Sequence, residues 1–270
     1  MTLTASLAGS TAHLSNPVKR VKQLLIPGLL GVTLTIGGLT TAHAQETLRA
    51  GGTPSGIPFT FLDVQTNEIT GAMVDVIHAL SEDMGYDVTV QESPFNALIP
   101  SLKAGKIDII SAAMLKTPKR AEVVAFSDDV YPYGESVIVQ NDYSGEITNL
   151  KDLEGEVIGA QVGTTYVRQL EETGLFPEIR NYDTLADMMR DVSLGRIVAG
   201  VGDKPIMGYQ LNEGLFPDLK LAEDYEQQMV GYIGLAVAQE NTELLDQVNT
   251  SLAKMKEDGT LQAIFDKWGL

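Results

Sequence analysis

Apolar positions along residues 48–270 follow two spacings, one helical and one strand-like, that alternate repeatedly. The helical spacing is clearest in residues 71–84, where an apolar stripe ends at Gly85. Further helices are expected at 97–104, from about 165, at 184–194 and at 244–268, the last with a break at Gly259. Apolar or alternating runs predict strands at 48–52, 87–91, 107–112, 136–139, 157–160, 197–202 and 232–238. Strands and helices fall into two clusters, so the pattern predicts an α/β fold with two lobes.

The first 44 residues have the pattern of a secretion signal. Lys19, Arg20 and Lys22 are their only charges, an apolar run covers 24–39, and small residues precede Gln45. A transmembrane anchor is the alternative, but the run is shorter than the roughly 20 residues that a span needs. We therefore expect cleavage near Ala44 and a periplasmic mature protein.

The net charge and the lack of cysteine limit which partners and which anchors the chain could have. Residues 45–270 hold 16 basic and 36 acidic residues, a formal charge of −20, which opposes binding to nucleic acid or anionic lipid. The chain has no cysteine, so neither a disulfide framework nor a lipid anchor on cysteine is expected. The core must hold the fold together unaided.

One segment carries a more specific signal. The helix expected at 97–104 turns at Gly105 into the apolar strand, and a loop then presents Arg120 in Thr-Pro-Lys-Arg, followed by Ala-Phe-Ser at 125–127. This order resembles the polar amino-acid-binding proteins of ABC importers, the solute-binding proteins of family 3, and the resemblance extends from Leu48 to Leu270. It implies a two-lobed α/β fold of type II. Lobe 1 would comprise 45–132 and 235–270, and lobe 2 would comprise 133–234. Two hinge crossings, near Tyr131 and Gly234, would flank a ligand cleft.

Two charged residues are candidates for gripping a ligand. Arg120 follows a buried strand, where α/β sheets place ligand contacts, although an arginine at a helix start is often only a solvated charge. Asp203 follows the strand at 197–202, where it could equally cap the next helix. The resemblance implies that Arg120 binds the carboxylate of the ligand and Asp203 its ammonium group, each by a charge-assisted contact.

Further pocket residues come from the same resemblance. Gly163, Thr164 and Thr165 match a Gly-Thr-Thr segment at a helix start, whose free N–H groups would share the ligand carboxylate; as plain sequence the segment is usually just a cap. Phe95 matches a position that packs on the aliphatic part of the ligand, and Phe59 is a second possible wall. Ordinary core packing is the alternative for both phenylalanines.

The chain also departs from the family pattern. Ala113 and Leu115 stand in a segment that is often rich in Ser and Thr, and Gly56 stands where many members have an aromatic lid. The lobe 1 wall should therefore be apolar, which favours ligands with an aliphatic or compact cationic body over glutamate and aspartate. The segment at 71–76, together with an apolar residue at Leu115, also resembles the ectoine-binding branch of the family, so a compatible solute is an alternative ligand.

An enzyme is the remaining alternative. His78 is the one histidine after residue 44, and no phosphate-binding loop is present, so triad or metal chemistry is not expected. Secreted cyclohexadienyl dehydratases resemble the same family, and Asp203 is the one cleft acid that could serve there as general acid. We expect instead a monomeric binding protein without cofactor. Ligand would dock on Arg120 and Phe95, lobe 2 would close over it, and a membrane permease would recognise the closed form.

Overall fold

The first sheet is built from segments that lie far apart in the sequence. A computed structural model describes residues 46–270, and the expected signal peptide lies outside these residues. The strand order is β5 (Asp87–Glu92), β1 (Thr47–Gly52), β6 (Ile109–Ile110), β14 (Ala236–Val237) and β7 (Ala125–Phe126). β1 runs parallel to β5 and β6, whereas β14 runs antiparallel to β6 and β7. This sheet and its helices are called lobe 1.

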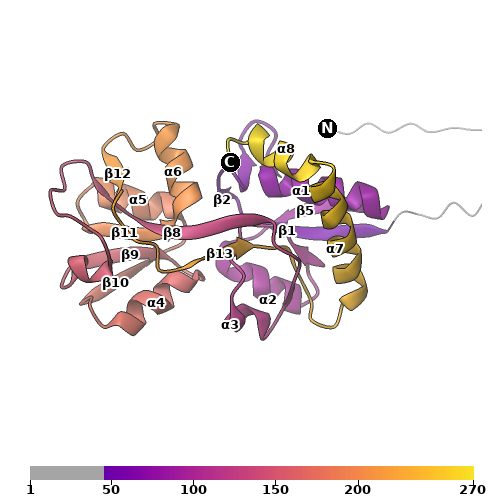
Figure 1. Cartoon of the computed structure of the whole chain (residues 1–270), viewed down its shortest axis with the longest axis horizontal. Coiled ribbons are helices and arrows are strands. Elements are labelled where there is room, and N and C mark those ends of the chain that lie inside the picture. The colour runs from indigo at the N-terminus through magenta and orange to yellow at the C-terminus, as the bar shows by residue number, and fades with distance from the viewer. Residues whose placement is uncertain (1–45) are drawn as a thin grey trace, which may run out of the picture. The chain divides into compact units, whose positions relative to one another are not determined.

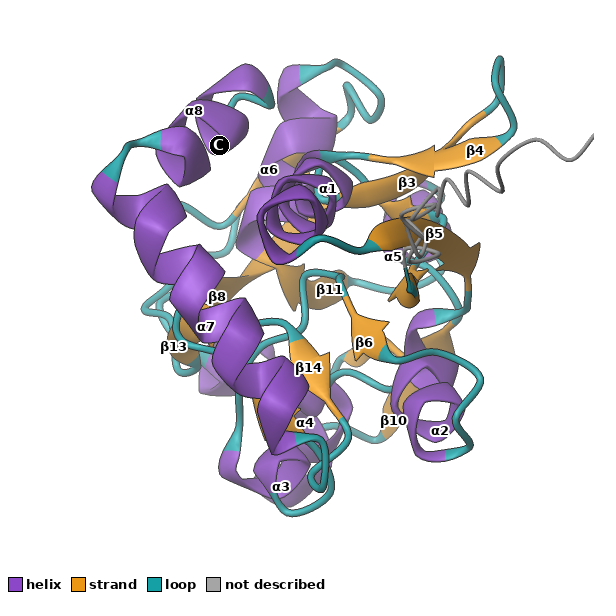
Figure 2. Ribbon diagram, turned by 90° about the vertical axis from the view of Figure 1, so that its right-hand side faces the viewer, coloured by secondary structure: helices purple, strands orange, loops and turns teal. Residues whose placement is uncertain are grey.

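Helices from both halves of the chain cover lobe 1. They are α1 (Ala72–Met84), α2 (Leu98–Lys103), α3 (Pro118–Ala121), α7 (Thr242–Glu257) and α8 (Thr260–Lys267). A small sheet of β2 (Ser55–Gly56), β3 (Thr60–Asp63) and β4 (Glu68–Thr70) and the short helix η1 (Phe95–Ala97) complete the lobe. The C-terminal helices α7 and α8 lie beside α1 (Figures 1 and 2). Asp75 of α1 accepts hydrogen bonds from Lys267 Nζ and Trp268 Nε1, both at 2.7 Å, and so ties the C-terminal end to lobe 1.

The second sheet, lobe 2, is formed by the middle of the chain. Its order is β10 (Glu178–Tyr182), β9 (Val157–Gln161), β11 (Ala199–Asp203), β8 (Tyr131–Gln140) and β12 (Leu219–Leu221). Its helices are η2 (Leu150–Leu153), α4 (Thr165–Thr173), α5 (Leu185–Ser193) and α6 (Lys204–Asn212). Tyr166 and Leu170 of α4 belong to one core cluster, and Met188 of α5 and Met207 of α6 belong to another. Accordingly, α4 covers one face of the sheet while α5 and α6 cover the other (Figure 1).

Two strands connect the lobes, and they are hydrogen-bonded to each other. β8 begins at Tyr131 and pairs first with β13 (Val230–Ile233), then with β11 and β12 further along. Figure 1 shows both strands passing between the two lobes. The two-lobed fold with two hinge crossings is thus confirmed. The lobe boundaries at 132/133 and 234/235, which fall inside β8 and just after β13, stay a prediction.

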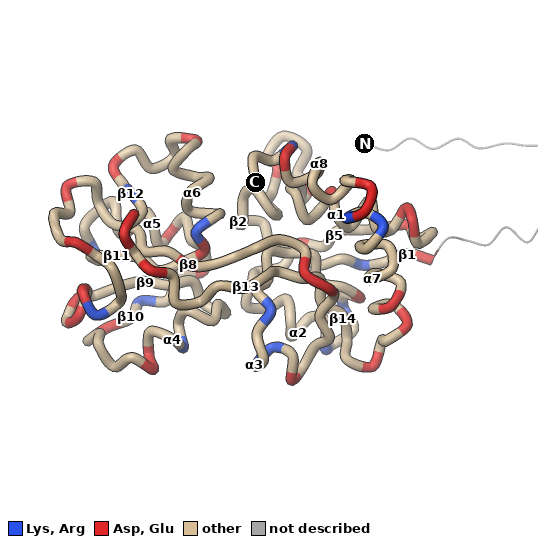
Figure 3. Tube along the Cα trace, viewed as in Figure 1, with Lys and Arg blue, Asp and Glu red and all other residues tan. Residues whose placement is uncertain are grey.

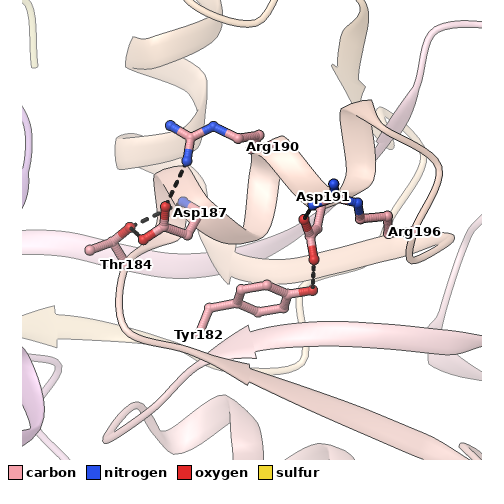
Figure 4. A network of polar contacts seen from close by, with 6 residues as sticks. All are labelled: Tyr182, Thr184, Asp187, Arg190, Asp191 and Arg196. Carbon is pink, nitrogen blue, oxygen red and sulfur yellow. Dashed lines mark hydrogen bonds and ion pairs between the residues drawn. The ribbon is translucent and has the colours of Figure 1, made fainter.

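A network of polar contacts fixes α5 in lobe 2 (Figure 4). Asp191 accepts hydrogen bonds from the Tyr182 hydroxyl and from Arg196 Nη1, both at 2.9 Å, and these bonds lower the pKa of the carboxyl. Thr184 caps the helix by accepting from the backbone N–H of Asp187 at 3.0 Å. These contacts join α5 to the end of β10 and to the segment before β11.

The predicted elements differ from the observed ones mainly in length. The run at 107–112 has strand geometry only at Ile109–Ile110, although the N–H groups of Asp108 and Ser111 extend its bonding to the carbonyls of β1. β8 is longer than predicted because its first four residues pair with β13. β2, β3, β4, β7, β10 and β12 were not predicted. The run predicted as one strand at 232–238 is divided between β13 and β14, which pair with different sheets. Among residues 46–270, no helix is both long and apolar enough to span a bilayer.

Candidate functional site

Arg120 is buried, with its guanidinium between the lobes. It is the third residue of α3, whose N-cap Thr117 accepts a hydrogen bond from the Arg120 N–H. Only 8% of the residue is exposed. Nη1 donates to the Leu115 carbonyl at 2.7 Å, Nη2 donates to the Gly163 carbonyl of lobe 2 at 3.1 Å, and the group stacks 5.5 Å from the centre of the Phe95 ring. A guanidinium has five N–H donors, so several remain for a ligand carboxylate.

Burial and charge act on Arg120 in opposite directions. Burial lowers the pKa of the guanidinium, and the nearby Asp203 charge raises it. An arginine starts from so high a pKa that it stays charged at neutral pH. The site therefore contains a desolvated guanidinium cation, two of whose N–H groups donate to neutral backbone carbonyls.

Asp203 is the matching buried acid, from lobe 2. It occupies the N-cap position of α6, but its side chain does not cap the helix. Instead Oδ1 accepts a hydrogen bond from the Tyr166 hydroxyl at 2.6 Å, and the residue is 6% exposed. Burial raises the pKa of Asp203 to about 6, although the Tyr166 hydrogen bond and the Arg120 charge both lower it. The carboxylate is consequently short of positive partners.

The hinge strand β8 adds two buried groups beside Asp203. Glu135 lies opposite Asp203 in the β8–β11 ladder, and Tyr133 is two residues earlier on the same face. Glu135 accepts hydrogen bonds from the backbone N–H groups of Gln228 and Met229, so it holds the segment that leads into β13. Tyr133 is 4% exposed, and its hydroxyl makes no hydrogen bond within the described part of the chain.

The start of α4 leaves donors free on the lobe 2 side. Thr164 is the N-cap residue and Thr165 the first helical residue, but no side chain caps the helix. The Thr164 hydroxyl donates instead to the Gln161 carbonyl at 2.6 Å. The first N–H groups of a helix lack partners within it and attract anions. Gly163 precedes them and directs its carbonyl to Arg120.

The remaining predicted residues lie at different depths. Phe95 and Leu115 contact Arg120 directly, as described above, and Leu115 forms a bridge with Ile233 of β13. Ala113 is buried in the loop that leads to Leu115. Phe59 is fully buried and packs edge-on against Tyr131 and Tyr133, with ring centres 5.6 and 5.5 Å apart. It therefore supports Tyr133 from behind, and its role as a pocket wall stays a prediction.

Two members of this cluster were not predicted from the sequence. Tyr166 directly follows the Gly-Thr-Thr segment, and Tyr133 begins a continuous run of buried residues in β8. Neither has a spacing that separates a functional tyrosine from a core tyrosine. A cluster of metal-ligating side chains is also missing from residues 46–270.

A separate groove lies along the hinge. Its volume is about 480 Å³. It is lined by Tyr131, Pro132, Tyr133, Gly134, Lys204, Pro205, Gln227, Val230, Gly231 and Tyr232. Neither Arg120 nor Asp203 lines it, so Tyr133 is the residue that the groove and the buried charge cluster share.

The two lobes touch each other in this structure. Besides the Arg120–Gly163 hydrogen bond, a Cβ added to Gly163 would come within 2.7 Å of Asn96 Cα in lobe 1. Gly56 of lobe 1 similarly approaches Ile206 of lobe 2. Closure therefore requires that position 163 carry no side chain.

Gly163→Ala should hinder closure and lower ligand affinity by roughly 10-fold or more, because an overpacked contact of this kind costs about 1–3 kcal/mol. Gly155→Ala is the matched control, since its φ of +86° resembles the +82° of Gly163 but no atom lies within 4 Å of the added Cβ. Calorimetry and X-ray scattering with and without ligand would measure both effects. Equal affinities in the two variants would contradict this role of Gly163.

Comparison with known proteins identifies relatives over nearly the whole described region. The family of bacterial extracellular solute-binding proteins, family 3, matches residues 48–270. ABC transporter arginine-binding protein 1 of Escherichia coli (strain K12) is 32% identical over 253 residues, which cover 92% of this chain and 99% of the relative.

Solved structures agree with this match. An ancestral arginine-binding protein, solved in one structure with arginine and in another with glutamine, is 29% identical to this chain. The TM-scores of the two structures are 0.76 and 0.75, and each match covers 84% of this chain and 99% of the solved one. An ancestral amino acid-binding protein that is a precursor of cyclohexadienyl dehydratase is 30% identical, with a TM-score of 0.74 over 82% of this chain and 95% of its own. The α/β fold of type II is thus confirmed.

Proposed function

The chain belongs to the bacterial extracellular solute-binding proteins of family 3, and we propose that it delivers a basic L-amino acid, with arginine as the first candidate, to an ABC importer. The observation that carries the proposal is the pair of buried opposite charges, Arg120 from lobe 1 and Asp203 from lobe 2. A zwitterion satisfies both, because its carboxylate meets the guanidinium and its ammonium group meets the carboxylate.

The side chain of the ligand is inferred from two further observations. Leu115 and Phe95 give lobe 1 an apolar and aromatic wall, which suits the methylenes and the cation of a basic amino acid. Acidic residues are spread over both lobes (Figure 3), and the charge of −20 for residues 45–270 attracts a cationic ligand. The arginine-binding relative supports the same choice.

Calorimetric titration with the common L-amino acids, ectoine and glycine betaine tests this assignment. Arginine should bind one to one and exceed glutamate and aspartate by roughly 10- to 100-fold, since an acidic side chain would lack partners on the apolar wall at about 1–3 kcal/mol per unsatisfied group. An acidic amino acid as the tightest ligand would contradict the inferred specificity. Tightest binding of ectoine would favour the compatible-solute alternative.

A second candidate function follows from the acidity of Asp203. A buried carboxyl with a pKa of about 6 is suited to general acid catalysis, and one structural neighbour is a precursor of a dehydratase. We propose that Asp203 binds an ammonium group and performs no chemistry, since Tyr166 and Arg120 already act on its charge. Mass spectrometry should recover the ligand unchanged and prephenate and arogenate unconverted. Turnover of either would favour the dehydratase.

The remaining assignments follow from the family and the sequence. We propose that the mature protein is a periplasmic monomer that begins near Gln45. We also propose that a membrane permease recognises its closed form. The close approach of Gly163 in lobe 2 to Asn96 in lobe 1 shows that the lobes can meet, which supports such recognition.

A further inference from the structure

We propose that the Tyr133 hydroxyl is a second acceptor for the α-ammonium group of the ligand, next to the Asp203 carboxylate, and that it selects primary amino acids over Nα-trimethylated ones. The inference rests on the proposed amino-acid-binding function and assigns a specificity residue within that site.

The first argument is that the hydroxyl lacks a partner. Tyr133 is 4% exposed, and its oxygen makes no hydrogen bond among residues 46–270. A buried polar group without a partner costs about 1–3 kcal/mol, so such groups in folded proteins usually have a reason. Tyr166, the other tyrosine beside Asp203, shows the contrast because its hydroxyl donates to the carboxylate at 2.6 Å.

The second argument is the electrostatic surroundings. Burial, the charge of Asp203 and a side-chain interaction with the Asp203 carboxylate raise the pKa of Tyr133, and the charge of Arg120 lowers it. Both charged groups that would bind the ligand therefore act on this hydroxyl. It stays protonated at neutral pH, and its oxygen keeps lone pairs that can accept a hydrogen bond.

The third argument is rigidity. Tyr133 belongs to β8, its ring packs edge-on against Phe59, and the backbone of Gly231 pairs with it across the hinge. A ring held in this way loses little further freedom when its hydroxyl binds a ligand, so the contact would be formed at low entropic cost.

The selectivity follows from donor counting. A primary ammonium group has three N–H donors, and the Asp203 carboxylate and the Tyr133 hydroxyl can each accept at least one of them. A trimethylated nitrogen has none, so it would leave the Tyr133 hydroxyl unsatisfied even when the ligand is bound. The site should therefore distinguish arginine from its Nα-trimethyl derivative through Tyr133.

Tyr133→Phe tests the proposal, and Tyr131→Phe is its matched control on the same strand and face. Both rings pack on Phe59, but burial alone raises the pKa of Tyr131, with no contribution from a charge of the site. Calorimetry with arginine should show a roughly 10- to 100-fold loss for Tyr133→Phe, as for a hydrogen bond to a charged group, and little change for Tyr131→Phe. The trimethyl derivative should bind wild type and Tyr133→Phe equally.

Thermal unfolding without ligand separates this role from a structural one. Tyr133→Phe removes a buried hydroxyl that lacks a well-formed hydrogen bond, so its melting temperature should stay close to or above that of wild type. A lower melting temperature with equal losses for both ligands, or an unchanged affinity for arginine, would overturn the proposal. If another amino acid binds wild type best, that amino acid and its trimethyl derivative replace arginine. If none binds wild type, the proposed function fails together with this inference.

Discussion

Arg120→Ala is expected to lower amino-acid affinity by roughly 30- to several thousand-fold while the protein stays folded. Removing one partner of a buried charge pair costs about 2–5 kcal/mol, partly because the ligand carboxylate is left without its counter-charge. The fold should survive because Arg120 donates only to two backbone carbonyls, those of Leu115 and Gly163.

Lys119→Ala is the matched control for Arg120. Lys119 precedes it in α3 and pairs with Glu122, but its side chain is 66% exposed, and an exposed ion pair contributes little. Calorimetry should therefore find wild-type affinity in Lys119→Ala. An affinity within threefold of wild type in a folded Arg120→Ala protein would refute the carboxylate assignment.

Asp203→Asn is expected to have opposite effects on stability and on binding. At pH 7 the carboxyl is ionised in the folded and the unfolded chain, and the raised folded pKa means that ionisation inside the site costs about 3 kcal/mol. The amide keeps an oxygen that can accept from Tyr166 but carries no charge. The unliganded variant should therefore be more stable than wild type, whereas ligand affinity should fall because the ammonium group loses its counter-charge.

Protonation of Asp203 should make both the stability of the folded protein and its ligand affinity depend on pH. Between about pH 4 and 6 the folded wild-type protein binds more protons at Asp203 than the unfolded chain does, so its stability at this site rises as the pH falls through that window. The difference in unfolding free energy between wild type and Asp203→Asn should therefore become smaller as the pH falls. Arginine affinity of the wild type should be constant above about pH 7 and decrease below it, because protonated Asp203 attracts the ammonium group less.

Denaturant unfolding and calorimetry from pH 4.5 to 8 measure both trends, with Asp142→Asn, an exposed position, as control. If Asp203→Asn is less stable than wild type at pH 7 and retains its affinity, the carboxylate is a structural group and the ammonium assignment is wrong.

The fold was largely predictable because its buried strands and helices carry strong periodic signals. The apolar runs around Ile109 and Val201 and the stripe of α1 have few other interpretations. The missed strands are short or polar. β10, for example, contains Arg180 and Asn181 and lies at the edge of its sheet, so burial imposes little alternation on it.

The site was only partly predictable. The positions of Arg120 and Asp203 after buried strands indicated ligand contacts, and their roles stay predictions until binding is measured. The burial of Arg120 depends on Gly163, which comes from the other lobe, and local sequence does not encode that contact. The unpartnered hydroxyl of Tyr133 is likewise a property of the packed cluster, since the same residue in a well-solvated strand would have no special role.

The central claim is that Arg120 binds the carboxylate of an amino acid, and a thermodynamic cycle tests it most directly. Wild type and Arg120→Ala are each titrated with L-arginine and with L-argininamide, which lacks only the charged carboxylate. If the two groups touch, the wild type should lose affinity for the amide, Arg120→Ala should hardly distinguish the two ligands, and the coupling free energy should be about 1–3 kcal/mol. Additive losses, with a coupling below about 0.5 kcal/mol, would contradict the account.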